Sequence, residues 1–393
     1  MYRRLHERVL CYPCRKDIKG LGFVKIQQRK GKNNMKVSWK KLLTAASAAL
    51  LCGALLTGCG GSGGSGGSDG SDGSGGGMLG SKSLGPDAPK EVVAQLKLGD
   101  KDVPLYEYKG AALPEKLQGF HSNLAVTKDA IYGLAYEKAD NDYHLKKLVL
   151  KDGAVASVED LGPVAKEGIS SDGTNIYYLD KTKNGNIGCY DGNATSTFTL
   201  KGVSVVRAVF GTHDAYTSGD FATKVDIMSG AISKEGLKDA KVVLSKDEFG
   251  KLKNNKAADE ENNSYLICAD KDGFYITTLA THGGGSDKWT QPLHMYGPDG
   301  KKVRTFECNE GIPDSAQKRK ISERQSIATK DYVVFYDRGF LRVFNKKDGK
   351  YVGDVELKIN GKNIEPAGAA VDDENHIYFI DHKTDANIYR IDL

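Results

Sequence analysis

A short phrase that recurs along the chain constrains the fold more than any other feature of the sequence. The phrase is a few residues of turn composition followed by an apolar or aromatic run, which is typical of the start of a β-strand. Its occurrences are Asp129–Tyr132, Thr174–Tyr177, Asp214–Tyr216, Gly273–Tyr275, Tyr332–Phe335 and His376–Tyr378. Because self-similarity of this kind is the signature of repeat architectures, we expect one structural unit to be repeated through the chain.

Glycine-containing turns recur between later strands of the same repeat. They are Lys151–Gly153, Tyr190–Gly192, Met228–Gly230, Pro298–Gly300 and Lys347–Gly349. Asp-Gly and Ser-Gly between apolar runs indicate hairpins, since a tight primed turn needs positive φ at its centre. The first two intervals between these glycines are 39 and 38 residues, close to the length of about 40 residues of a four-stranded propeller blade.

The repeat predicts an all-β fold, a six-bladed β-propeller over residues 90–393, with seven blades as the alternative. The longest interval, between Gly230 and Gly300, could hold an extra blade, but residues 245–263 are too polar to supply two buried strands. The last repeat lacks a fourth strand, and we expect Glu91–Leu98 to supply it and to cover an edge prone to aggregation. The pattern resembles the six-bladed propellers of the TolB-like and NHL-like kind.

The N-terminal part of the chain has the features of an export signal. After Met35, three lysines precede an uncharged run, Leu42–Leu56, whose 15 residues are too short to span a bilayer and suit a signal-peptide core. The run is followed by Leu-Thr-Gly-Cys, with the cysteine at position 59. This segment resembles the lipobox of bacterial lipoproteins. The resemblance implies that residues 35–58 are a signal peptide and that Cys59 carries diacylglycerol and palmitate.

Two further segments complete the expected organisation. We expect translation to start at Met35, which makes residues 1–34 an over-extended, disordered start. Residues 60–77 consist of glycine, serine and aspartate, and these side chains cannot bury apolar surface, so we expect residues 59–89 to form a flexible tether. Together the segments predict a lipid-anchored protein of the cell envelope that faces the periplasm or the exterior.

The net charge of the chain differs in sign before and after Cys59. The whole sequence has a formal net charge of +5. Residues 1–58 contain 13 basic and 2 acidic side chains, which leaves 43 basic and 49 acidic side chains from Cys59 onward. Because nucleic-acid binding needs a concentrated positive surface, this distribution argues against a nucleic-acid partner.

Three long segments are expected to gather on one face of the propeller. In a blade whose strands alternate in direction, the loop between strands two and three shares a face with the connections between blades. Residues 245–263, 281–289 and 310–324 would meet there, and long loops often carry function. The candidate interaction residues are His282, Trp289, Lys318, Arg319, Lys320 and Arg324. Solvated insertions without a partner are the alternative interpretation.

The motifs of common catalytic and metal sites do not stand out in the sequence. Outside residues 60–77, it contains no G-x-S-x-G, H-E-x-x-H or Walker motif. Asp270–Gly273 has part of a calcium loop, but it falls where a hairpin turn is expected. We therefore assign no catalytic residue, no metal and no cofactor.

These features favour a non-enzymatic binding or assembly module, held at the membrane through lipid on Cys59, with an envelope protein or a glycan as partner. The alternative is an exported hydrolase or lyase acting on glycan or peptide, because a propeller channel can hold a site that leaves no linear motif. Close carboxylates or several histidines in the channel would favour the enzyme. Ordered long loops around the fourth blade would favour the binding module.

Overall fold

The chain is built almost wholly from β-strands in the part that the computed structural model describes. The described residues are 83–110, 124–165, 168–181, 186–200, 203, 205–218, 226–249, 262–280, 292–319, 321, 325–337, 339–381 and 387–393. Within them the helices are single turns, α1 (Lys246–Phe249) and α2 (Asp314–Gln317), and neither could cross a membrane. The predicted all-β fold class is confirmed.

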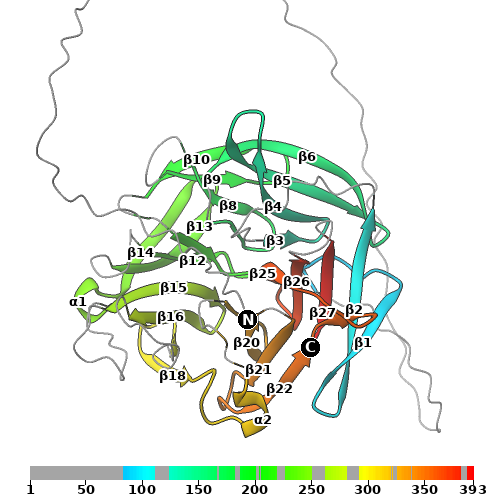
Figure 1. Cartoon of the computed structure of the whole chain (residues 1–393). Coiled ribbons are helices and arrows are strands. Elements are labelled where there is room, and N and C mark those ends of the chain that lie inside the picture. Colours follow the sequence, from blue (N-terminus) through cyan, green and yellow to red (C-terminus); the bar gives the residue numbers. More distant parts are fainter. Residues whose placement is uncertain are drawn as a thin grey trace, which may run out of the picture. The chain divides into compact units, whose positions relative to one another are not determined.

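The strands form blades of four antiparallel strands that surround a common centre (Figure 1). The first two blades are β3–β6 (Leu124–Thr127, Ala130–Glu137, Asp142–Lys151, Ala154–Val164) and β7–β10 (Ser170–Ser171, Ile176–Leu179, Asn186–Tyr190, Thr195–Thr199). The next are β11–β14 (Val205–Ala208, Asp214–Ser218, Ile227–Ser233, Gly236–Leu244) and β15–β18 (Asn262–Asp270, Gly273–Ala280, Leu293–Tyr296, Lys302–Phe306). Then comes β19–β22 (Ser326–Ala328, Tyr332–Asp337, Phe340–Asn345, Tyr351–Glu356).

The innermost strands form a closed ring. Neighbours in this ring are β3, β7, β11, β15, β19, β25 (Pro366–Val371) and β3 again. Each repeated phrase identified in the sequence lies at the start of a second strand, next to one of these inner strands. Four-stranded sheets arranged radially around a channel define a β-propeller. The number of blades, six with seven as the alternative, stays a prediction.

The closing blade joins strands from the two ends of the described chain. It contains β25, β26 (His376–Asp381) and β27 (Ile388–Asp392), and its fourth strand is β2 (Lys101–Gly110), which is antiparallel to β27. The expectation that Glu91–Leu98 supplies the fourth strand is therefore wrong. That segment forms β1 (Val92–Leu98), which pairs with β2 as a fifth strand.

The position of a proline explains how β2 can lie beside β27. Proline has no N–H to donate and is normally confined to edges or to the ends of a ladder. Pro104 pairs only with Gln95 of β1, and the ladder between β2 and β27 begins at the next residue, Leu105. At its other end, β2 pairs in parallel with β6 through Lys109 and Gly110, which connects the closing blade to the first blade.

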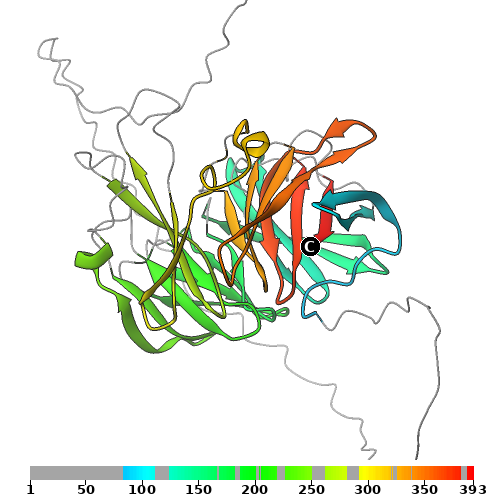
Figure 2. The same ribbon diagram turned by 90° about the horizontal axis from the view of Figure 1, so that it is seen from below.

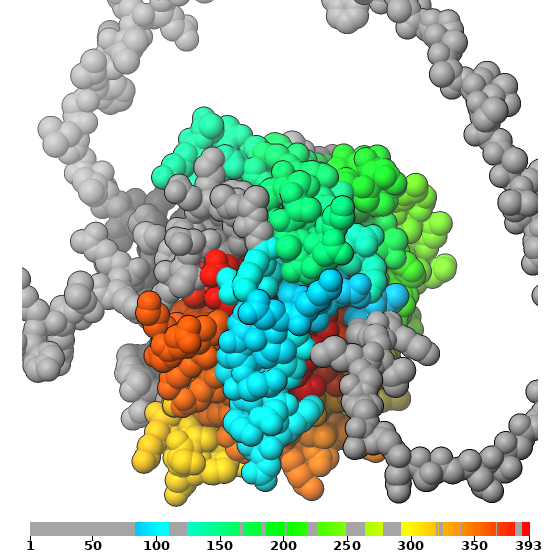
Figure 3. All heavy atoms as spheres, turned by 90° about the vertical axis from the view of Figure 1, so that its right-hand side faces the viewer, coloured from blue at the N-terminus to red at the C-terminus, as the bar shows by residue number. Residues whose placement is uncertain are grey.

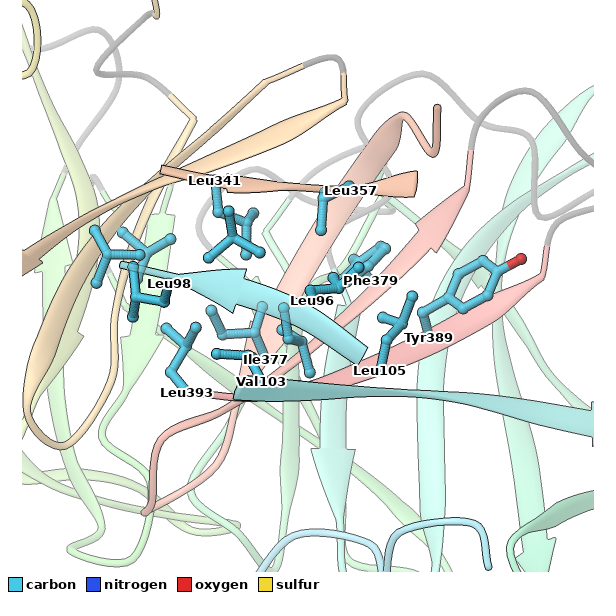
Figure 4. Close-up of a cluster of buried hydrophobic side chains, with 14 of the residues drawn as sticks. Leu96, Leu98, Val103, Leu105, Leu341, Leu357, Ile377, Phe379, Tyr389 and Leu393 are labelled. Atoms are coloured by element: carbon cyan, nitrogen blue, oxygen red, sulfur yellow. The ribbon is translucent and has the colours of Figure 1, made fainter. Parts of the chain in front are cut away.

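Apolar packing holds the β1–β2 hairpin in place. Leu96 and Leu98 of β1 and Val103 and Leu105 of β2 are buried in a cluster with Phe379 of the closing blade and Leu341 of the neighbouring blade (Figure 4). β1 also packs against β22, and the hairpin runs along the surface between two blades (Figure 3). Burial of each such side chain stabilises the fold by about 1.5–3 kcal/mol, so the hairpin is an integral part of the ring.

Four of the five predicted glycine turns are confirmed. Gly153, Gly192, Gly300 and Gly349 have φ between 73° and 94°, and each lies between the third and fourth strands of its blade. Asp152 also has positive φ, so Asp152 and Gly153 form a primed two-residue turn.

The fifth predicted turn, at Gly230, is wrong. Gly230 lies inside β13 at a β-bulge, and the turn comes later, between Ser233 and Gly236. A Cβ at Gly230 would lie only 2.5 Å from the carbonyl oxygen of Lys238. The glycine is needed because two backbone segments approach closely.

Candidate functional site

The alternating strand directions divide the propeller into two faces. One face, which we call the turn face, carries the turns between strands one and two and between strands three and four of each blade. The opposite face, which we call the loop face, carries the loops between strands two and three and the connections between blades. The segments that join β14 to β15, β16 to β17 and β18 to β19 all start and end on the loop face. The three long segments are therefore attached to one face.

Two of the predicted interaction residues, Lys318 and Arg319, are described, and both are exposed just after α2. Outside the described residues lie Cys59, His282, Trp289, Lys320 and Arg324. Figure 2 shows α2 on the same side of the molecule as the small hairpin β23–β24 (Lys358–Ile359, Lys362–Asn363).

Arg319 belongs to a cluster of mixed charge. Its guanidinium forms an ion pair with Glu356 and lies 5.4 Å from the ring centroid of Phe340. The ammonium of Lys358 lies 2.7 Å from the same carboxylate. Hydrogen bonds from Lys358 and Arg319 lower the pKa of Glu356 to about 2. The positive charge of the predicted interaction residues is thus partly neutralised at this point.

A fully buried arginine fixes the same segment to its blade. Arg342 of β21 pairs with Asp354 of β22 through two hydrogen bonds of 2.9 Å each. Its guanidinium also donates to the carbonyl oxygens of Cys308, Ala316 and Arg319. A buried charge is stable only when it is paired and hydrogen-bonded. This side chain therefore holds residues 308–319 in one arrangement.

Asn309 completes what we call the Arg342 cluster, made of Arg342, Asp354 and Asn309. The side-chain oxygen of Asn309 accepts from the Ile321 amide at 3.0 Å, and its Nδ2 donates to the Ile321 carbonyl at 2.8 Å. α2 thus lies in a segment that is anchored on both sides. The sequence analysis missed this cluster, although an arginine within the apolar run Phe340–Phe344 was a signal for it.

One hydrogen bond recurs in alternate blades on the turn face. An aspartate at or just after the end of the first strand accepts from a tyrosine hydroxyl of the second strand. The pairs are Asp172–Tyr177, Asp270–Tyr275 and Asp372–Tyr378, each with an O···O distance of 2.9 Å. Burial raises the pKa of all three tyrosines, so their hydroxyls remain protonated donors.

Lys346 connects two neighbouring blades on this face. Its Nζ lies 3.1 Å from Asp270, 2.7 Å from Asp272 and 2.8 Å from the carbonyl oxygen of Thr329. Asp270–Gly273 therefore forms the hairpin turn that the sequence analysis expected, and its carboxylates are paired with a lysine. In the part of the chain that the structure describes, no group of His, Cys, Asp and Glu side chains is arranged to hold a metal ion.

Residues 83–89, which the sequence analysis assigned to the tether, lie against the turn face. We call them the strap. The hydroxyl of Ser83 donates to Asp372 at 2.6 Å, and the Leu84 amide donates to Asp373 at 2.8 Å. Both aspartates lie in the turn between β25 and β26, so the strap begins next to the channel.

Buried side chains of the closing blade hold the middle of the strap. The carbonyl oxygen of Pro86 accepts from Arg390 at 2.6 Å and from the Tyr378 hydroxyl at 3.3 Å. The hydroxyl of Tyr108 donates to the carbonyl oxygen of Asp87 at 3.0 Å. The strap thus has a defined path across the turn face.

The channel contains a cavity of about 170 Å³ whose wall includes residues from every inner strand. Most of the wall is small or apolar. Its polar residues are Ser170, Ser171, Arg207, Cys268, Ser326 and Tyr336. The lining in the described part of the chain includes neither carboxylate nor histidine, the groups that the hydrolase or lyase alternative would need there.

No protein-family model matches the chain, and no curated protein matches it either. Similar solved structures include BamB from Moraxella catarrhalis, at 11% identity over 69% of this chain and 82% of that chain, with a TM-score of 0.34. The β-propeller domain of Cps50 (Swd1) from Myceliophteria thermophila is 8% identical over 69% and 83%, with a TM-score of 0.40. An oligogalacturonate lyase from Vibrio parahaemolyticus is 11% identical over 78% and 98%, also with a TM-score of 0.40. These likenesses are too distant to carry a statement about function, and the fold assignment rests on the strand pairing.

Proposed function

We propose that this chain is a lipid-anchored lipoprotein of the bacterial cell envelope, facing the periplasm or the exterior. Its propeller is a non-enzymatic binding or assembly module for an envelope protein or glycan, which it contacts through the loop face. The export signal, the lipobox-like segment before Cys59 and the glycine-rich segment support the anchor. The observation that carries the choice of face is the docking of the strap.

The strap determines where a tether leaves the folded domain. Ser83 is only 4% exposed, and Leu84 reaches toward the turn between β11 and β12, where its Cδ1 would lie 3.3 Å from a Cβ at Gly211. The chain preceding the strap therefore joins the domain at the turn face, near the channel mouth. A lipid on Cys59 would attach the domain to the membrane from this face and leave the opposite loop face accessible to a partner.

The Arg342 cluster supports the loop face as a recognition surface. Binding costs less when the surface is already ordered, because less conformational entropy is lost. Residues 308–319 are held by a buried guanidinium, so Lys318 extends from a fixed base. The mixed charges of Arg319, Glu356 and Lys358 next to it favour a polar, orientation-specific contact.

Photo-crosslinking in intact cells tests the orientation. A photoreactive residue in place of Lys318 probes the loop face, and one in place of Lys271, an exposed lysine on the turn face, is the matched control. We expect a discrete protein or glycan adduct from position 318 and none of that mass from position 271. The same adduct from both positions, or none from position 318, would contradict the proposed face.

Labelling with radioactive palmitate tests the anchor separately. We expect the label in the wild-type protein and its loss in Cys59→Ser, together with release of the variant from the membrane fraction. Label that persists in Cys59→Ser would refute lipidation at this residue.

A further inference from the structure

Two short segments of the chain have the sequence of an acceptor site for an N-linked glycan, which is asparagine, any residue except proline, and then serine or threonine. They are Asn193–Thr195 and Asn262–Ser264. A transferase must reach both the carboxamide of the asparagine and the hydroxyl two residues later. The structure separates the two segments on this criterion.

The segment Asn262–Ser264 lies at the start of β15. All three of its residues belong to the ladder between β15 and β16. Ser264 has none of its surface exposed, so an enzyme cannot reach its hydroxyl in the folded protein. Asn262 is therefore excluded as an acceptor once the chain has folded.

The segment Asn193–Thr195 lies in the turn between the third and fourth strands of the second blade. Asn193 is exposed in this turn, and Thr195 is exposed as the first residue of β10. β10 is the last strand of its sheet and lies at the outer rim of the molecule (Figure 1). Both groups that a transferase must reach are therefore at the surface.

Hydrogen bonds hold the turn in one conformation. The carboxylate of Asp191 accepts from the backbone amides of Asn193 and Ala194 at 3.0 and 2.9 Å. The Tyr190 hydroxyl donates to the carbonyl oxygen of Gly192 at 2.6 Å. These bonds engage the backbone of Asn193 and not its side chain, so the exposed carboxamide is available to an enzyme.

β10 also differs from the fourth strands of the other blades in how its edge is protected. Natural proteins protect edge strands with charged side chains, prolines or β-bulges. β6, β14, β18 and β22 all contain charged residues, and each has an irregular ladder with its neighbour. β10 has the sequence Thr-Ser-Thr-Phe-Thr, and its ladder with β9 is regular. Its edge therefore lacks all three kinds of protection.

The exposed side chains of β10 are suited to contact with a sugar. Ser196 donates to the carbonyl oxygen of Lys234 in the next blade at 3.0 Å, whereas Thr195, Thr197 and Thr199 are exposed. A neutral hydroxyl loses less hydration free energy than a charged group when a ligand covers it. A glycan that starts at Asn193 would thus meet a row of hydroxyl groups along the unprotected edge.

We propose that Asn193 is the acceptor of an N-linked glycan, which shields the edge of β10. The carboxamide nitrogen forms a bond to the anomeric carbon of an oligosaccharide carried on a lipid diphosphate. The bond from this carbon to the diphosphate oxygen breaks, the lipid diphosphate leaves with the electron pair, and the nitrogen gives one proton to a base of the transferase. The inference rests on the export that is part of the proposed function. Because the turn lies on the turn face, the glycan leaves the loop face free.

Glycan transfer in vitro tests the acceptor without relying on export. The folded full-length chain in detergent is incubated with an oligosaccharyltransferase and a lipid diphosphate-linked oligosaccharide, and intact-mass spectrometry detects the product. We expect a mass gain of one oligosaccharide in the wild type, in Thr195→Ser and in the control Asn262→Gln. Asn193→Gln and Thr195→Val should gain none. No gain in the wild type, or a gain that persists in Asn193→Gln, would overturn the proposal.

Protein recovered from its own cells separates this inference from the proposed anchor. We expect a glycan at Asn193 on protein that also carries the palmitate label. Labelled protein without a glycan would refute the glycan and leave the anchor intact. A glycan on unlabelled protein would support the acceptor and contradict the anchor.

The shielding of β10 is measured by light scattering during heating. The glycosylated wild type should aggregate more slowly than Asn193→Gln. Adding a charge to the edge with Thr197→Lys in the Asn193→Gln background should restore part of the resistance, because lysine protects edge strands. Equal aggregation of the glycosylated protein and Asn193→Gln would refute the shielding role.

Discussion

The two faces of the propeller are held together in different ways. On the turn face, a short aspartate–tyrosine hydrogen bond recurs in alternate blades, and its partners are close neighbours in the sequence. On the loop face, Arg342 alone contacts its neighbouring strand and three carbonyl groups of a long connection. These turn-face bonds thus each lie within a single repeat, while the connection on the loop face depends on long-range contacts of one side chain.

This difference indicates which face is free to vary. A turn stabilised from within its own repeat leaves little room for inserted residues. A connection held at a few backbone carbonyls can change its outer side chains, provided that these carbonyls still meet the guanidinium. Variation between blades is therefore expected on the loop face, which agrees with the three long segments attached there and with the usual location of binding residues on loops of a rigid scaffold.

The largest effect is expected from Arg342→Met, which tests whether one side chain holds the loop face. The change leaves partly buried Asp354 and three carbonyl oxygens without their cationic donor, and we expect a loss of about 3 kcal/mol in the free energy of unfolding. Urea denaturation measures it, and limited proteolysis should show new cleavage within residues 308–319. Arg319→Met, an exposed arginine of the same segment, is the control. Equal destabilisation by both changes would show that Arg342 has no special role.

A smaller effect is expected from Gly85→Ala, which tests the strap. A Cβ at this position would lie 2.5 Å from Asp372 Oδ2 and 2.8 Å from the Tyr378 hydroxyl. We expect displacement of the strap and a loss of about 2–3 kcal/mol. Hydrogen exchange should become faster at the amides of Leu84 and Gly85. Unchanged exchange there would mean that the strap contributes nothing to the turn face.

Tyr275→Phe and Tyr132→Phe together compare a turn that has the aspartate–tyrosine hydrogen bond with one that does not. The change removes the hydroxyl that donates to partly buried Asp270, and we expect a loss of about 1–2 kcal/mol because bonds to charged groups are the stronger ones. In the first blade, Tyr132 has a hydrogen bond to Thr127 instead, so Tyr132→Phe should cost less. Thermal unfolding of both variants measures the difference, and the reverse order would contradict a special role for the aspartates.

The smallest effect concerns two histidines in the third strands of different blades. Burial lowers the pKa of His294 to about 4, so the unfolded chain binds this proton more readily, and stability falls as the pH falls from about 6.5 toward 4. Between pH 8 and pH 5.5 we expect a loss of about 1 kcal/mol from this residue. Urea titrations at both pH values measure it, and His294→Asn should remove this part of the pH dependence. A variant with the full wild-type dependence would exclude His294 as its source.

His144 should behave in the opposite way. Burial acts against its charged form, but hydrogen bonds to Asp160 and Asp140 outweigh this and raise its pKa. Its contribution to stability is therefore complete below the ordinary histidine pKa and is lost as the pH rises through the raised value. In His144→Asn, stability should no longer decline over this upper range.

The sequence predicts what is local and repeated. The second strands and four turns follow from patterns that each blade encodes in its own residues. The role of Gly230 could not be predicted in this way, because the glycine is needed where the backbone approaches Lys238 closely. A Ser-Gly pair has the same composition at a turn and at a β-bulge. Pro104 makes Lys101–Gly110 a poor strand candidate by composition, because proline cannot donate a ladder hydrogen bond. Only the structure shows that the ladder with β27 begins after this residue, at Leu105.

The candidate sites could be predicted only in part. Lys318 and Arg319 belong to a polar segment that composition identifies as a surface connection. Neither Arg342 nor Arg207 stands out, because a charged residue in an apolar strand has the same pattern whether it contacts solvent, a buried partner or a channel. Their surroundings depend on strands distant in the chain, and a single sequence does not specify these.

The pairing of β2 with β27 has a consequence for biogenesis. β2 is synthesised well before Ile388–Asp392 and must wait for these residues, because they form its ladder partner and lie far from it in the sequence. Contacts so distant in sequence carry the greatest entropic penalty and slow folding. Until they form, the hairpin exposes an unpaired edge and the leucines of Figure 4, so nascent chains that still lack β27 should be the species most dependent on chaperones.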